Sequence, residues 1–195
     1  RELLVLDTQT MSVIHTIDDV AVTCMLRSQY GPFLMTCDRG NTVKFVNTET
    51  YKVTKFTDEQ IAFIKIQESK RDENIWHVVT QWGAEGIVGI YDHSVKTWRP
   101  KVSFPFHEAA EYPSDFLVMP NEQKAYMATM GGNYPGENHA YGWLYSIDLA
   151  GEQLTVIPID GGAQSLELSQ DSQRLYVGTS WPVPNGNNLL VVDTQ

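Results

Sequence analysis

Five histidines and two cysteines are the side chains of this sequence that could bind a metal or transfer a proton. His107 is the most informative histidine, because Phe106-His107-Glu108 joins two expected β-strands. A histidine in such a connection could act as an acid, a base or an axial metal ligand, or it could simply bond to a neighbouring loop. His139, in a long polar stretch, could take the same roles. No two histidines have His-x-His or His-x3-His spacing, so the sequence predicts no metal site.

Other catalytic motifs are absent from the sequence. It contains no glycine-rich phosphate loop, nucleophile elbow, haem-binding Cys-x-x-Cys-His or zinc motif. The acid pairs Asp18-Asp19, Asp58-Glu59 and Asp72-Glu73 all fall at expected turns, where we expect solvated carboxylates. The sequence therefore assigns no catalytic residue.

Cys24 and Cys37 occupy two expected strands that are joined by a turn near Tyr30 and Gly31. Counted outward from that turn, the two cysteines fall opposite each other, where cross-strand Cβ atoms are about 4.5 to 5.5 Å apart. A disulfide is therefore geometrically possible, and a lone pair of cysteines fits an oxidising compartment. The alternative is two buried thiols that pack as small hydrophobic groups. We predict the disulfide, and with it a periplasmic or otherwise exported protein.

The composition is that of a globular protein with a negative net charge. The 195 residues are 42% hydrophobic and carry a net charge of −10. Such a field repels phosphate backbones and anionic membrane surfaces, and it attracts basic proteins such as some electron carriers. No apolar run approaches the roughly 18 to 20 residues of a membrane span. We therefore expect protein partners, with no nucleic acid and no membrane span.

A repeated phrase predicts the elements that position these side chains. Leu4-Val5-Leu6-Asp7-Thr8-Gln9 returns as Leu190-Val191-Val192-Asp193-Thr194-Gln195, and weaker copies contain Asn47, Asp92 and Asp148 at the position of the Asp. Successive Asp or Asn landmarks are 40 to 56 residues apart. A repeat of about 40 to 50 residues with four strands is typical of a β-propeller blade. The sequence therefore predicts an all-β propeller of four-stranded blades, with about four blades present.

The turn signals divide the chain into five units. The predicted units are a partial blade over 1–19, blades over 20–58, 59–106 and 107–160, and a partial blade over 161–195. The chain could close as a four-bladed ring, or it could be part of a seven- or eight-bladed propeller. We favour the larger propeller, because closure would make the first and last third strands compete for one position.

Two predicted insertions are rich in aromatic, Pro, Gly and Asn residues. They cover 131–141 and 181–188, and both interrupt the connection from a second to a third strand. Rigid rings on loops are effective anchors for a partner, although the same loops could merely pack against adjacent blades. The predicted ligand or partner contacts are Trp82, His107, Tyr134, His139, Tyr141 and Trp181.

Two family resemblances rest on these motifs. The turns at Met119-Pro120-Asn121-Glu122 and Leu168-Ser169-Gln170-Asp171-Ser172, each followed by a strand containing tyrosine, resemble the YVTN propellers of bacteria and archaea. The segment from Cys24 to Lys44, with Phe33-Leu34-Met35-Thr36-Cys37-Asp38-Arg39-Gly40 at its centre, resembles the heavy chain of quinoprotein amine dehydrogenases such as methylamine dehydrogenase. It is also similar to the cytochrome d1-type and thiocyanate-oxidising propellers.

These resemblances imply a function that the residues alone do not specify. The amine dehydrogenase heavy chain implies a seven-bladed periplasmic propeller that holds a light chain with a quinone made from two tryptophans. This chain would then be a scaffold for that light chain or an electron carrier and would bind no cofactor itself. The alternatives are a propeller oxidoreductase that holds d1 haem or copper through His107 and His139, and a non-enzymatic surface or binding propeller.

Overall fold

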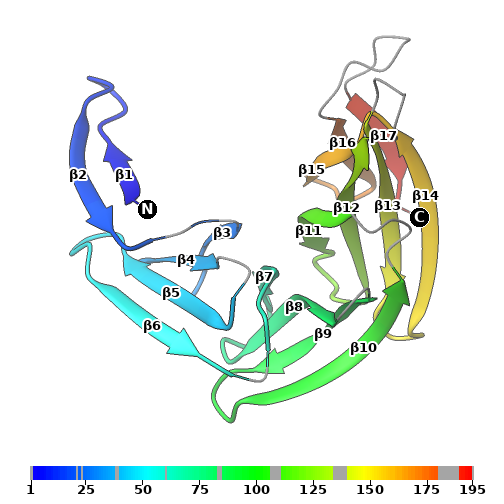
Figure 1. The fold of residues 1–195 in the computed structure, drawn as a ribbon, viewed down its shortest axis with the longest axis horizontal. Helices are drawn as coiled ribbons and strands as arrows, with labels where there is room; N and C mark the ends of the chain where they lie inside the picture. The colour runs from blue at the N-terminus through cyan, green and yellow to red at the C-terminus, as the bar shows by residue number, and fades with distance from the viewer. Residues whose placement is uncertain are drawn as a thin grey trace.

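The structure is a computed structural model in which every described element is a β-strand (Figure 1). It describes residues 2–20, 22, 24–37, 40–59, 61–82, 85–105, 111–133, 140–179 and 189–194. The strands form three four-stranded sheets, one three-stranded sheet and one two-stranded sheet. The predicted all-β propeller with about four blades is therefore confirmed. Within these residues no helix has the length and apolar character to cross a membrane.

The sheets follow one another along the chain, and their antiparallel strands pair in sequence order. The N-terminal hairpin contains β1 (Glu2–Leu6) and β2 (Val13–Asp18). Blade 1 contains β3 (Cys24–Arg27), β4 (Phe33–Cys37), β5 (Thr42–Asn47) and β6 (Val53–Thr57). Blade 2 contains β7 (Lys65–Glu68), β8 (Ile75–Trp82), β9 (Glu85–Asp92) and β10 (Thr97–Pro105). Blade 3 contains β11 (Tyr112–Val118), β12 (Lys124–Asn133), β13 (Ala140–Asp148) and β14 (Gln153–Asp160). The C-terminal sheet contains β15 (Ala163–Leu168), β16 (Arg174–Thr179) and β17 (Leu189–Asp193).

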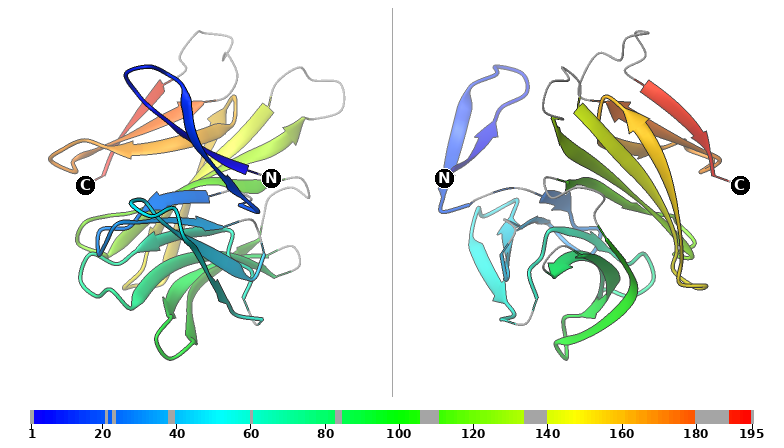
Figure 2. Two further views of the ribbon diagram at one scale, coloured as in Figure 1. Left: turned by 90° about the vertical axis from the view of Figure 1, so that its left-hand side faces the viewer. Right: turned by 45° about the vertical axis from the view of Figure 1, so that its right-hand side comes forward.

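The sheets are arranged radially in an open arc (Figure 1). The first strands β3, β7, β11 and β15 lie on the inner side, and the fourth strands β6, β10 and β14 lie on the outer side. The arc is open between the N-terminal hairpin and the C-terminal sheet, as the right-hand view of Figure 2 also shows. Because β1 and β17 belong to separate sheets, they do not compete for one position. The blade number of a complete ring stays a prediction.

The repeated Asp or Asn has the same role in the N-terminal hairpin and in blades 1 to 3. It lies at the end of the third strand, and its Oδ1 accepts the N–H groups two and three residues later, as in the Asp148 bonds from Ala150 and Gly151, both 2.9 Å. Asp7, Asn47 and Asp92 accept equivalent bonds. Four residues after each landmark the backbone has positive φ, at Met11, Tyr51, Lys96 and Glu152. The repeat in the sequence is thus a side chain that caps the turn to the fourth strand.

The apolar cores lie between neighbouring sheets. One core joins Met35 of blade 1 to Trp76 of blade 2, and the next joins Val88 of blade 2 to Met127 of blade 3. A third joins blade 3 to the C-terminal sheet. Burial of apolar surface between sheets is the main force that holds successive blades together.

The strand positions correct one sequence prediction. The non-strand insertion expected at Gly131–Tyr141 is shorter, because pairing continues to Asn133 and resumes at Ala140.

The predicted disulfide between Cys24 and Cys37 is confirmed. The two residues are direct partners in the β3–β4 pair, with their Cα atoms 5.1 Å apart. Because the pair lies in adjacent strands of one blade, the bond reinforces a hairpin and does not join separate blades. It is consistent with an oxidising, exported environment.

Candidate partner-binding face

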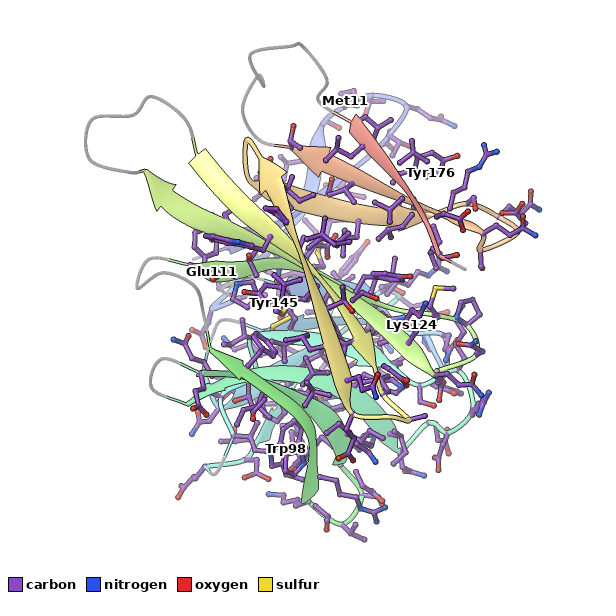
Figure 3. The ribbon with its side chains drawn as sticks, turned by 90° about the vertical axis from the view of Figure 1, so that its right-hand side faces the viewer. Met11, Trp98, Glu111, Lys124, Tyr145 and Tyr176 are labelled. Carbon is purple, nitrogen blue, oxygen red and sulfur yellow. A yellow bond between two sulfur atoms is a disulfide. The ribbon has the colours of Figure 1, made fainter. Side chains whose placement is uncertain are left out.

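One end of the blades is the end at which the second strand connects to the third and the fourth strand connects to the next sheet, and we call it the loop face. In the sequence, the predicted contact residues fall in or beside these connections. Antiparallel pairing places the turns from first to second and from third to fourth strand at the opposite end, the turn face. Figure 3 shows the two ends in blade 3, with Glu111 toward the loop face and Lys124 toward the turn face.

Only two of the six predicted contacts lie on described backbone. Trp82 is the last residue of β8 and pairs with Glu85. Tyr141 pairs with Asp160 near the end of the β13–β14 ladder. The remaining four, His107, Tyr134, His139 and Trp181, lie outside the described residues. Topology therefore assigns Trp82 and Tyr141 to the loop face, and the contact role of all six stays a proposal.

The connection from blade 3 to the C-terminal sheet is fixed by glycines beside Tyr141. Gly161 and Gly162 have φ of 87° and 72°, which L side chains rarely adopt. A Cβ on Gly142 would lie 2.2 Å from the Thr129 oxygen and 2.6 Å from the Ala163 nitrogen. Glycine at these positions lets the backbone of β13 approach the start of the next sheet closely.

A buried carboxylate holds the start of blade 3. Glu111 directly precedes β11 and is 5% exposed. Its Oε1 accepts hydrogen bonds from the Thr129 hydroxyl at 2.6 Å and from the Tyr145 hydroxyl at 2.7 Å, and Figure 3 shows Glu111 beside Tyr145. Burial, the bond to Glu111 and its negative charge raise the pKa of Tyr145 far above its usual range. Tyr145 therefore stays a neutral donor, as a structural clamp requires.

The connection from blade 1 to blade 2 has a similar clamp. The Tyr91 hydroxyl donates to the buried Asp58 carboxylate. Burial and this bond raise the pKa of Tyr91. The prediction of a solvated acid pair at Asp58-Glu59 is therefore wrong for Asp58. The sequence signal that could have identified both clamps is an acid ahead of the first strand together with a tyrosine in the third.

Hydrogen bonds between first strands align the blades. The Lys65 ammonium donates to the Ser114 carbonyl at 2.5 Å, and the Ser114 hydroxyl donates to the Ala163 carbonyl at 2.5 Å. Asp115 accepts the Leu166 N–H at 2.8 Å. These bonds connect β7 to β11 and β11 to β15. Together with the apolar cores between the blades, these hydrogen bonds hold the first strands of neighbouring blades in a fixed arrangement.

The buried histidine of blade 2 is a structural residue. His77 is 2% exposed, and its Nε2 lies 3.6 Å from Glu122 Oε2. Burial lowers the pKa of His77 more than the nearby Glu122 carboxylate raises it, so the ring is neutral near pH 7. In the described part of the chain, no group of three or more His, Cys, Asp or Glu side chains could hold a metal.

Comparison with known proteins gives the fold and no family. No protein-family model and no curated protein matches the sequence. The β-propeller domain of Myceliophteria thermophila Cps50 (Swd1) is similar in structure, with a TM-score of 0.59 and 14% identity over 91% of this chain and 56% of that one. The Neurospora crassa Pan2 WD40 domain has a TM-score of 0.59 and 13% identity over 100% of this chain and 60% of that one.

A chain of the mitotic checkpoint complex is a further structural neighbour, with a TM-score of 0.52 and 13% identity over 86% of this chain and 49% of that one. At these identities the likeness establishes a propeller fold with WD40-type neighbours and nothing finer. The chain spans about half to three fifths of the length of these structures.

Proposed function

We propose that this chain is a non-catalytic binding propeller that presents its loop face to a protein partner. The observation that supports this most is that buried hydrogen bonds fix the ends of the strands from which the loop face is built. The buried acids Asp58 and Glu111 accept hydrogen bonds from tyrosine hydroxyls, so they clamp the chain ahead of the first strands of blades 2 and 3 to those blades. A preordered base lowers the entropic cost of binding for the loops that it carries.

Aromatic side chains would supply the anchors. Trp82 and Tyr141 lie on strands that end at the loop face, and Tyr134 and Trp181 belong to the adjoining loops in the sequence. Tyr and Trp dominate binding energy at protein interfaces, because they bury much surface for little side-chain entropy. His107 and His139 would add polar contacts.

A more specific form of the proposal makes the partner a redox subunit. The resemblance of the Cys24–Lys44 segment to an amine dehydrogenase heavy chain supports it, as do the disulfide and the net charge of −10. The partner would be a light chain that bears a tryptophan-derived quinone, or a basic electron carrier. A stoichiometric metal or a haem spectrum in the purified chain would instead favour a haem or copper enzyme with His107 and His139 as ligands.

Site-specific photo-crosslinking in the native host tests the loop face. We would place p-benzoylphenylalanine at Trp181 or Tyr141, and at the exposed Gln170, in the turn between β15 and β16, as a control on the turn face away from the junction of blade 1 and blade 2. We expect one discrete adduct from the loop-face positions and none from Gln170. Adducts of the same mass and yield from all three positions would contradict the proposal, and mass spectrometry of the adduct would show whether the partner carries a quinone.

A further inference from the structure

A cavity of about 370 Å³ opens between blade 1 and blade 2 on the turn face. Its walls come from the turn between β3 and β4, from β5 and β6, and from the residues around the ends of β8 and β9. It lies at the opposite end of the blades from the loop face. A ligand of this cavity would therefore bind whether or not the loop face has a partner.

Aromatic rings from both blades line this cavity. Phe45 and Phe56 of blade 1 lie 5.8 Å and 5.3 Å from Trp76 of blade 2, measured between ring centroids. His93 stacks on Trp76 at 4.3 Å. Phe33, which is 36% exposed, also lines the cavity. Tyr30 lines it as well, so two neighbouring blades bring six rings around one opening.

A buried carboxylate lies in the same wall. Glu68 is 9% exposed, and it accepts bonds from the Ser28 hydroxyl at 2.6 Å and from the Gln29 N–H at 2.9 Å. Both donors are neutral. The ion pairs found among the described residues involve other acids, namely Asp19, Glu122 and Glu152. Within the described part of the chain, the charge of Glu68 therefore has no cationic partner at ion-pair distance.

This combination attracts a cation. A buried charge without a counter-ion is costly, so a cation that reaches it gains more than at an exposed acid. Aromatic faces attract cations as well, and the molecule contains an example at this edge: the Lys96 ammonium lies 5.4 Å from the centroid of Phe56. The exposed Glu73 adds negative charge to the lining.

We propose that the cavity binds an arginine side chain from a basic segment of a protein partner. Each Glu68 oxygen accepts one of the two hydrogen bonds from Ser28 and Gln29 and retains a lone pair. The guanidinium fork matches two such acceptors, and its plane stacks on aromatic rings, a combination that the ammonium of lysine does not offer. The net charge of −10 draws a basic segment toward this surface.

Fluorescence anisotropy with a dye-labelled Gly/Ser peptide that carries paired arginines tests this site. The first control is the same peptide with citrulline, which keeps the shape and loses the charge. The second control is a protein variant: Glu68→Gln is compared with Glu122→Gln, which removes the same charge from an acid that also accepts bonds across a blade junction, from Ser69 and Lys70.

We expect Glu68→Gln and citrulline each to weaken binding about tenfold or more, since a charge-assisted bond contributes about 1.5 to 3 kcal/mol. Glu122→Gln should change the affinity less than twofold. Phe33→Leu keeps every charge and removes one ring, so it should weaken binding about threefold. This second variant keeps the test valid if Glu68→Gln fails to fold. Equal binding of the citrulline peptide, or equal loss in both glutamine variants, would overturn the proposal.

Discussion

Replacement of Gly142 by alanine tests how closely β13 must approach the next sheet at the loop face. The added Cβ would lie 2.2 Å from the Thr129 oxygen, 2.6 Å from the Ala163 nitrogen and 2.8 Å from the Gly162 Cα. All three are backbone atoms, two of them at the start of the next sheet. No rotamer change can relieve these contacts, so the strands or the blade junction must move.

Gly142→Ala should lower the free energy of unfolding by about 3 kcal/mol, which is the upper end of the range for overpacked sites. For a chain of this size about 1 kcal/mol corresponds to roughly 2 to 4 °C, so the Tm should fall by about 6 to 12 °C. The measurement is thermal unfolding followed by far-ultraviolet circular dichroism, with urea unfolding to obtain the free energy.

Gly178→Ala is the matched control in the adjacent sheet. There the new Cβ would meet the Ser165 hydroxyl at 2.4 Å, with the backbone no nearer than 4.0 Å. That hydroxyl can rotate away, and alanine in a strand gains about 0.5 to 1 kcal/mol over glycine. We therefore expect a change within about 1 kcal/mol of the native protein. Equal stability of the two variants would refute the argument that backbone contact at Gly142 fixes the junction.

Three further predictions concern the turns, the disulfide and the buried histidine. Backbone N–H bonds from Gly151 and Ala150 lower the pKa of Asp148, so Asp148→Ala should reduce the Tm at pH 7. The difference in Tm between this variant and the native protein should shrink as the pH falls through that lowered pKa. Asp148→Asn keeps the acceptor oxygen, so its Tm should stay near that of the native protein both at pH 7 and below the lowered pKa. Cys24→Ser opens a loop with a sequence separation of 13 and should cost about 3 kcal/mol, and the native protein under reducing conditions should show the same loss. Because burial lowers the pKa of His77 below its ordinary 6.5, the unfolded chain binds a proton first on acidification. At pH 5.5 the free energy of unfolding of the native protein should therefore fall by up to about 1.4 kcal/mol, a loss that His77→Phe does not show. Urea unfolding at pH 7.5 and 5.5 measures this difference, and an identical pH dependence of the two proteins would contradict the prediction.

The fold was predictable because each unit repeats its local chemistry. The Asp or Asn at the end of the third strand caps its own turn with bonds to residues only two or three positions away, so the pattern is visible without knowledge of the neighbours. The same holds for the Cys24–Cys37 pair, since a short hairpin fixes its register. Local periodicity therefore determined the blades and the disulfide.

The buried acids were not predictable in this way. Asp58 and Glu68 look like ordinary polar residues in the sequence, and their burial depends on partners 33 and 40 residues away. The aromatic cavity likewise combines Phe45 and Phe56 with Trp76 of another blade. Such juxtapositions depend on how one blade packs against the next.

The sequence by itself thus determined the order of the strands, the position of the capping residues and the negative charge, because these arise from local turn chemistry and composition. Only the tertiary structure decided which acids lose their water and which rings meet across a blade junction. The physical reason is that desolvation and ring packing arise when two sheets bury a shared surface, and the sequence of either sheet alone does not specify the register of that contact.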